Sequence, residues 1–156
     1  MEAVSTTRTT NTFAVTGIDP AHADLLRAAG GIDYVADDKP GFPCRQCLRD
    51  AEIGEEMILV SYDPFEQASP YRSASPISLH RSSCSPFDAD DLPEQLTGRN
   101  LSVRAFDGTA MMQDGVVIDG RDLQTTIDAL FANPAVEYLH VHNAGRGCWA
   151  AKVRRA

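Results

Sequence analysis

The clearest periodic pattern of hydrophobic positions lies in the last third of the chain. Apolar side chains recur there at intervals that bring them to one face of an α-helix. They are Leu123, Ile127, Leu130 and Phe131. Asn133-Pro134 follows, and the residue before a proline disfavours helical backbone. The pattern therefore predicts an amphipathic helix over 123–131.

An earlier segment carries a helix start and a helix stop around a weaker pattern. Asp19-Pro20 supplies an N-cap and a proline at the first helical position. Gly30-Gly31 supplies the stop. Between them, we expect Leu25, Leu26 and Ala29 to line the apolar face of a second helix.

Short segments rich in β-branched and aromatic residues predict strands along the rest of the chain. They are the segment of Phe13, Val15 and Ile18, then 57–62, 77–80, 101–106, 116–118, 136–142 and 148–153. The last two are joined by 143–147, a glycine-rich loop of about five residues, which is a usual length for a hairpin. We expect this C-terminal hairpin to be a central part of the sheet.

The alternation of side chains along a strand divides the residues of 136–142 between two faces. Leu139 and Val141 lie on one face and His140 and His142 on the other. Burying an imidazole without a partner costs about 1–3 kcal/mol, so we expect the two apolar residues to face the main core. The histidines would then face a second layer, a cleft or solvent.

Turn-forming and polar residues separate these elements. Residues 36–43 and 63–76 predict loops, 44–51 one helical turn, and 85–100 an acidic stretch with a helical turn near 92–96. Hairpins and isolated helices in one chain favour an α+β fold with a mainly antiparallel sheet, two helices and long loops. We predict a single domain over 11–156, preceded by a disordered lead-in over 1–10.

Composition narrows the classes of partner. The chain has 156 residues, of which 43% are hydrophobic and 23% charged, and its formal net charge is −8. A domain of this length buries about 68–70% of its unfolded surface and can build an ordinary core. Its negative charge argues against non-specific binding to nucleic acid or anionic membranes. Binding to a protein partner and assembly into a homo-oligomer both remain compatible with this composition.

The N-terminal sequence favours a cytoplasmic protein. It lacks a basic region followed by an apolar one, and no stretch reaches the ~20 apolar residues of a membrane span. Thiols stay reduced in the cytoplasm. The cysteines are therefore interpreted as metal ligands, redox thiols or buried packing before they are interpreted as disulfides.

Three cysteines and one histidine form two closely spaced pairs. Cys44 and Cys47 make a Cys-x-x-Cys pair, and His80 and Cys84 a His-x3-Cys pair. Two such pairs of soft ligands can make a closed tetrahedral zinc site. Leu48 stands where zinc-binding turns often place glycine. Buried thiols without a ligand remain an alternative.

Two thiol chemistries are further alternatives. Cys44 and Cys47 could act as a redox pair, because neighbouring arginines and a helix N-terminus lower the pKa of a thiol. Cys148 could act as a nucleophile with His140 or His142 and Asn143, since cysteine, histidine and an amide form a known catalytic set. Ordinary packing within the sheet would explain the second group equally.

Short motifs across most of the chain form a combined pattern. They are Pro43-Cys44-Arg45-x-Cys47-Leu48, Gly54-Glu55-Glu56, Ser61-Tyr62-x-Pro64-Phe65, Ser69-Pro70-Tyr71, Pro76-Ile77, His80, Cys84, His140-Val141-x-Asn143-Ala144 and Gly147-Cys148. This pattern resembles the small bacterial family called domain of unknown function 1203. The resemblance implies a compact bacterial protein and no activity.

The residues themselves spell out no reaction, and whether the protein is an enzyme stays open. They favour a small protein stabilised by zinc that acts as a binding or assembly module. The alternative is a thiol-dependent enzyme, redox or hydrolytic, that uses Cys44 and Cys47 or Cys148.

Overall fold

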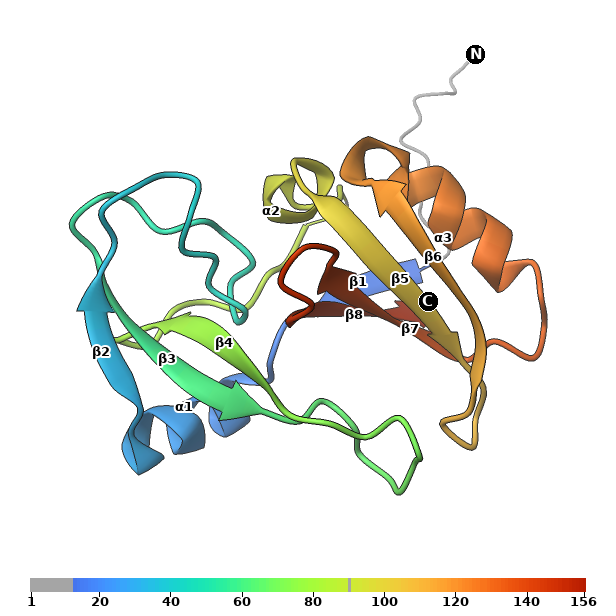
Figure 1. Cartoon of the computed structure of the whole chain (residues 1–156), viewed down its shortest axis with the longest axis horizontal. Helices are drawn as coiled ribbons and strands as arrows, with labels where there is room; N and C mark the ends of the chain where they lie inside the picture. Colours follow the sequence, from blue (N-terminus) through green and yellow to red (C-terminus); the bar gives the residue numbers. More distant parts are fainter. Residues whose placement is uncertain (1–12, 90) are drawn as a thin grey trace, which may run out of the picture.

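The C-terminal hairpin lies in the middle of a five-stranded antiparallel sheet (Figure 1). The computed structural model describes residues 13–89 and 91–156, so the predicted lead-in lies outside the described residues. The strand order is β1 (Phe13–Thr16), β8 (Trp149–Arg155), β7 (Tyr138–Asn143), β5 (Asn100–Phe106) and β6 (Met112–Asp119). The predicted central position of the hairpin is confirmed.

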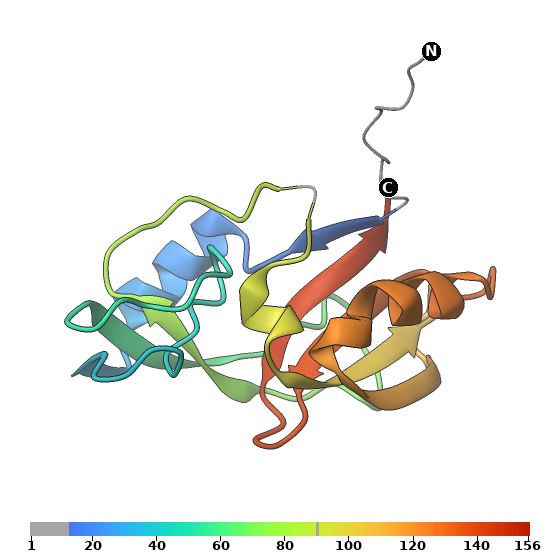
Figure 2. The ribbon, with the colours of Figure 1, turned by 90° about the horizontal axis from the view of Figure 1, so that it is seen from above.

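A second sheet has three antiparallel strands, in the order β2 (Ile32–Val35), β3 (Glu56–Tyr62) and β4 (Ser75–His80). The sequence pattern did not predict β2. It is an edge strand in which Ile32 and Val35 are exposed, so no buried face produces an alternating pattern. The two sheets lie side by side, with α1 (Pro20–Ala29) next to the smaller one (Figure 2).

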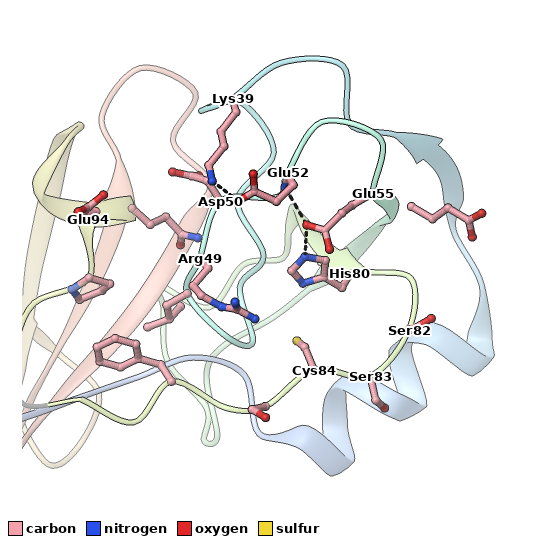
Figure 3. Close-up of a pocket in the computed structure, with 16 residues that line it drawn as sticks. Lys39, Arg49, Asp50, Glu52, Glu55, His80, Ser82, Ser83, Cys84 and Glu94 are labelled. Atoms are coloured by element: carbon pink, nitrogen blue, oxygen red, sulfur yellow. Dashed lines mark hydrogen bonds and ion pairs between the residues drawn. The ribbon is translucent and has the colours of Figure 1, made fainter.

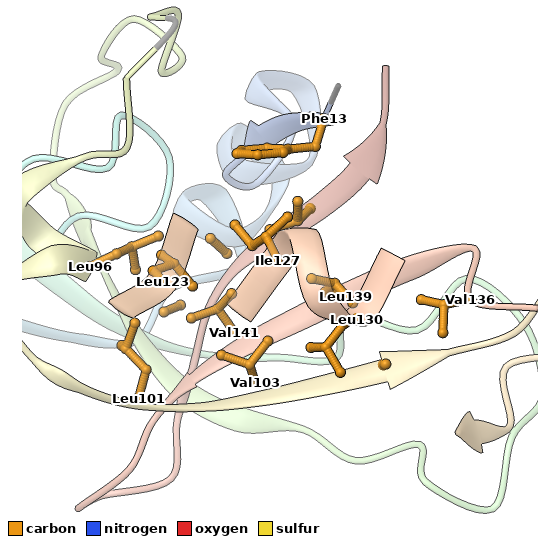
Figure 4. Packing of buried hydrophobic residues seen from close by; sticks show 14 of the residues in the cluster. Phe13, Leu96, Leu101, Val103, Leu123, Ile127, Leu130, Val136, Leu139 and Val141 are labelled. Atoms are coloured by element: carbon orange, nitrogen blue, oxygen red, sulfur yellow. The ribbon is translucent and has the colours of Figure 1, made fainter. Parts of the chain in front are cut away.

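The larger sheet packs one face against α3 (Leu123–Phe131), which follows the short 3-10 turn η1 (Gly120–Asp122). The side chains predicted to face this core, Leu139 and Val141, are fully buried there. Ile127 of α3 and Leu101 of β5 belong to the same apolar cluster (Figure 4). The fold is therefore α+β with antiparallel sheets, as the sequence predicts.

The opposite face of the larger sheet carries the two histidines. His140 is 1% exposed and packs between aromatic rings, with its centroid 4.9 Å from that of Phe65 and 5.2 Å from that of Phe106. Residues 63–74 connect β3 to β4 and cover this face, and Ser69 donates a hydrogen bond to the carbonyl of Ala110. The loop predicted over 63–76 ends two residues earlier, where β4 begins. We call this the aromatic face.

Helix α1 buries a different face from the predicted one. Its buried residues are Ala23 and Arg27, whereas Leu25 is 71% exposed. The prediction was therefore wrong for Leu25 and Ala29, because the surroundings of the helix include polar groups that a guanidinium can bind. Leu26 is partly buried and packs against the core, as predicted.

None of the helices in the described part of the chain is long and apolar enough to cross a membrane.

Candidate metal centre

The first two ligand candidates lie on a closed turn of the backbone. The amide of Leu48 donates to the carbonyl of Cys44, and the amide of Cys44 donates to the carbonyl of Arg49. Leu48 has φ 58, so it adopts the left-handed conformation that glycine adopts most easily. The predicted helical turn over 44–51 is wrong, because the chain reverses here and pairs Pro43 with Asp50. We call residues 44–48 the Cys-x-x-Cys turn.

This turn packs against the edge of β4, which brings the second pair of ligands to the first. Cys44 pairs with Ser78 of β4, and the amide of Arg45 donates to the carbonyl of Ser78. His80 is the last residue of β4, and Cys84 follows in the segment that leaves the strand. The Cys-x-x-Cys turn also contacts the link from β1 to α1, where a side chain on Gly17 would collide with the carbonyl of Arg45.

The four predicted residues come together in one place. Each offers one ligand atom, and these atoms all lie within 4.8 Å of one another. The set of Cys44, Cys47, His80 and Cys84, called the Cys3His cluster below, could hold a metal ion. Cys44 and Cys47 are buried, and all four cysteines of the chain are free thiols.

The imidazole of His80 is oriented by a carboxylate. Its Nε2 lies 3.2 Å from Oε1 of Glu55, while its Nδ1 lies 3.6 Å from Sγ of Cys47. A hydrogen bond from Nε2–H to Glu55 leaves the lone pair of Nδ1 facing the sulfurs. Histidines that bind metals commonly donate their other ring N–H to a carboxylate in this way.

The protonatable groups of the cluster act strongly on one another. Hydrogen bonds with Cys47 and Cys84 lower the pKa of Cys44, and hydrogen bonds with Cys44 and Cys47 raise the pKa of His80 to about 10. The same kind of contact with Cys44 and Cys47 raises the pKa of Cys84. The groups therefore compete for protons, and a divalent cation would replace these protons and let every sulfur ionise.

Arg27 and Gln46 hold the two ligand pairs together. Arg27 donates from Nε to the carbonyl of His80 at 2.8 Å and from Nη2 to Oε1 of Gln46 at 2.6 Å. Gln46 donates to the carbonyl of Cys84 at 2.6 Å. Nη2 of Arg27 also lies 3.9 Å from the sulfur of Cys84, where its charge favours a thiolate.

Sequence reasoning missed Arg27, because a single arginine in the last turn of a helix ordinarily interacts with the helix dipole. Its i, i+4 spacing from Ala23 was the only local signal of an inward face.

The Cys-x-x-Cys turn is also joined to the short helix that precedes β5. Arg45 is 1% exposed, and its Nη1 donates to Oε1 of Gln95 in α2 (Glu94–Thr97) at 2.7 Å. Gln95 in turn donates to the carbonyl of Cys44 at 3.2 Å. Burial lowers the pKa of Arg45 to about 10. These contacts fix the turn between β4 and α2.

A cleft of about 1110 Å³ opens beside the Cys3His cluster (Figure 3). His80 and Cys84 line it on one side, and Glu94 and Gln95 of α2 on the other. Arg49 also lines it, and the electrostatic interaction with nearby Cys47 raises the pKa of this guanidinium. Two members of the ligand set, His80 and Cys84, are therefore part of the wall of this cleft.

The structure does not bring all members of the predicted catalytic set around Cys148 together. Cys148 accepts a hydrogen bond from Nδ2 of Asn143 at 3.5 Å. His142 instead contacts the carbonyl of Gly147 through Nδ1, at 2.9 Å. Within the described residues, no hydrogen bond joins the sulfur of Cys148 to His140 or His142, so the structure brings together only the cysteine and the amide of that set.

Burial keeps both histidines of the aromatic face neutral. It is the main cause that lowers the pKa of His140 to about 3 and that of His142 to about 4. Neither belongs to the Cys3His cluster.

A family model described as "Protein of unknown function (DUF1203)" matches residues 41–155. The matched segment contains the whole Cys3His cluster. No curated protein and no solved structure matches the chain.

Proposed function

Because this chain belongs to the DUF1203 family, whose description names no activity, we propose its function from the Cys3His cluster: a small domain stabilised by zinc that acts as a binding or assembly module. Three sulfurs and one imidazole are ligands that zinc prefers, whereas calcium and magnesium take oxygen ligands. Four protein ligands leave no open coordination position, so the metal would have a structural role.

The spacing of the ligand atoms carries this proposal. A tetrahedral zinc ion with the usual bond lengths separates two sulfurs by about 3.8 Å, and a sulfur from a nitrogen by about 3.6 Å. The sulfurs of Cys44 and Cys84 are 3.6 Å apart, and Sγ of Cys47 is 3.6 Å from Nδ1 of His80. Both distances are close to the edges of such a tetrahedron.

Nearby charges also suit zinc. With three thiolates, the bound ion would leave a net charge of −1 on the cluster. Arg27 lies 3.9 Å from one sulfur, and the charge of another acts on Arg49. Two guanidinium groups beside a cluster with excess negative charge offset the cost of burying it. Reduced thiols at the site fit a cytoplasmic location.

The cleft supports the binding part of the proposal. Several of its acidic residues are already paired, as Asp50 is with Arg99 and Glu55 with His80. Glu56 and Glu94 line the cleft without a basic partner among the described residues. Unpaired carboxylates favour a partner that presents basic side chains.

Elemental analysis tests the metal. Protein produced without a histidine tag should contain about one equivalent of zinc per chain. Cys44→Ser and Cys84→Ser should each lower that content by about tenfold or more. Cys148→Ser is the matched control, since it makes the same change outside the cluster and should keep the zinc. A native protein with less than about a tenth of an equivalent of zinc would overturn the proposal.

A peptide titration tests the cleft. A short lysine-rich peptide should shift the amide NMR signals of residues around Glu56 and Glu94, and added salt should weaken the effect. Glu56→Gln with Glu94→Gln should reduce it, and a glutamate-rich peptide should have none. Shifts spread evenly over the surface would contradict a binding site in the cleft.

A thiol enzyme is the second candidate, and the contact between Asn143 and Cys148 favours it. Cys148 is partly exposed, so a thiol reagent can reach it. Rapid alkylation of Cys148 near neutral pH, with a rate that rises with pH, would support this function. If every cysteine reacts only after denaturation, the protein is not a thiol enzyme.

A further inference from the structure

A second, smaller cavity lies on the aromatic face, and no residue of the Cys3His cluster lines it. Its volume is about 100 Å³. Residues of the loop over 63–74 form one wall, and Arg104 of β5 and His142 of β7 form another. The proposed zinc module makes no use of this cavity.

Arg104 is a positioned cation without an acidic partner. Its Nε donates to Oγ of Ser102 at 3.2 Å, and its Nη1 lies 3.5 Å from Nε2 of His142. Across 13–89 and 91–156, no carboxylate forms an ion pair with this guanidinium. Half-buried charges are ordinarily paired, so the free N–H groups of Arg104 need an anion.

The partners of Arg104 cannot supply that negative charge. His142 is 7% exposed, and its Nδ1–H donates to the carbonyl of Gly147 at 2.9 Å. Its Nε2 therefore presents a neutral lone pair to Arg104. Ser102 is also neutral. Both groups orient the guanidinium and leave its charge uncompensated.

The remaining walls are apolar. Phe65 and Phe106 line the cavity, with their rings 5.3 Å apart and nearly perpendicular. A cavity of about 150 Å³ takes a benzene molecule, so about 100 Å³ suits four or five non-hydrogen atoms. The site thus combines one cation, hydrogen-bond donors and a hydrocarbon wall in a space for a very small molecule.

We propose that this cavity binds a short aliphatic monocarboxylate, whose carboxylate pairs with Arg104 and whose hydrocarbon chain contacts Phe65 and Phe106. The planar guanidinium matches a carboxylate in a bidentate arrangement. Tyr71 and Ser73 at the cavity place further hydroxyl groups beside it. A ligand of this size binds weakly, with a Kd in the millimolar range.

Propionate and propionamide form the decisive pair of probes, because they have nearly the same shape and differ in charge. Titrated into the protein as purified, propionate should shift the amide signals around Arg104 and His142, and propionamide should bind about tenfold or more weakly. Equal binding of the two, or propionate shifts located elsewhere, would overturn the proposal. This comparison needs no variant and is independent of the metal content.

Variants of Arg104 test its role in binding propionate. Arg104→Gln should weaken propionate binding by about tenfold or more, whereas Arg121→Gln, an exposed arginine on η1, should leave it unchanged. Unchanged binding to Arg104→Gln would overturn the role of Arg104. If Arg104→Gln does not fold, Arg104→Lys keeps the charge but loses the bidentate geometry, and it should bind propionate less tightly than the native protein.

Discussion

The two sheets of this protein are stabilised in different ways. The larger sheet and α3 share a cluster in which nearly every buried side chain is aliphatic, such as Leu101 and Ile127. The cluster at the smaller sheet includes Cys44 and Cys47, and its largest member, Trp149, comes from β8 of the larger sheet. The smaller sheet therefore has its own apolar core, built from side chains of β3 and β4 such as Ile58 and Leu79, but that core also contains two candidate metal ligands and a side chain from the larger sheet.

Buried polar contacts accompany this smaller apolar core. Arg27, Arg45 and Gln46 are buried around the Cys-x-x-Cys turn and bond it to α1, α2 and the segment of Cys84. Buried polar groups contribute little net free energy, and they become costly when a partner moves away. A bound metal would hold all of these partners in place, so the comparison predicts that the smaller sheet depends on it and the larger sheet does not.

Removing the metal should have the largest effect. Zinc contributes about 10–16 kcal/mol to the folding of zinc-finger peptides. Treatment with a chelator should therefore abolish hydrogen-exchange protection in β3 and β4 and retain most of it in β5 and β7. Hydrogen exchange followed by mass spectrometry resolves the two sheets. An equal loss of protection in both would contradict the difference between them.

A cavity created in the core of the larger sheet should have the next largest effect. It should lower the stability of the protein without changing its metal content. Ile127 is fully buried between α3 and the sheet, so Ile127→Ala should lower the free energy of unfolding by about 2–5 kcal/mol. The zinc content of the folded protein should not change. Urea denaturation and elemental analysis measure the two quantities. A loss of zinc in this variant would show that the cores are not independent.

Acid should destabilise the aromatic face. The pKa of His140 is about 3 in the folded protein, below the value of about 6.5 in an unfolded chain. The unfolded chain therefore binds more protons between these values, so this stability is complete above about pH 6.5 and is lost as the pH falls. The loss amounts to about 2 kcal/mol at pH 5.

His140→Phe separates this effect from acid release of the metal, because the thiolates of the variant are unchanged. The variant should lose less stability than the native protein between pH 7 and pH 5, measured by urea denaturation at each pH. Parallel pH profiles would mean that His140 gains a proton without cost.

The elements predicted correctly from the sequence have local signals. The helix over 123–131 and the C-terminal hairpin both bury one regular face, so periodicity reveals them. The two ligand pairs are also local, because each needs only a turn or a strand end. What failed depends on distant contacts: Arg27 is buried because the carbonyl of His80, at the end of β4, and the side chain of Gln46 accept its hydrogen bonds. The sequence of α1 does not reveal where these acceptors lie.

Leu48 belongs to both the Cys-x-x-Cys turn and the core of the larger sheet. Its backbone, with φ 58, closes the Cys-x-x-Cys turn, while its side chain is 1% exposed and packs in the cluster of the larger sheet. The leucine explains why the expected glycine is missing: the larger core gains a buried side chain at a cost in backbone strain. For an L-residue, the left-handed conformation costs about 1–2 kcal/mol.

Two variants of Leu48 should reveal that strain. Leu48→Ala and Leu48→Gly both lose the buried side chain, which costs about 2–5 kcal/mol. Alanine keeps the strain, and glycine removes it but gains about 0.5–1 kcal/mol of entropy cost on folding. Leu48→Gly should therefore be more stable than Leu48→Ala by up to about 1 kcal/mol, the reverse of the usual order, and both should retain zinc. Urea denaturation of the two variants measures this difference in stability. If Leu48→Ala is the more stable variant, the left-handed backbone at Leu48 carries no strain. The larger core would then gain its leucine without cost to the smaller sheet.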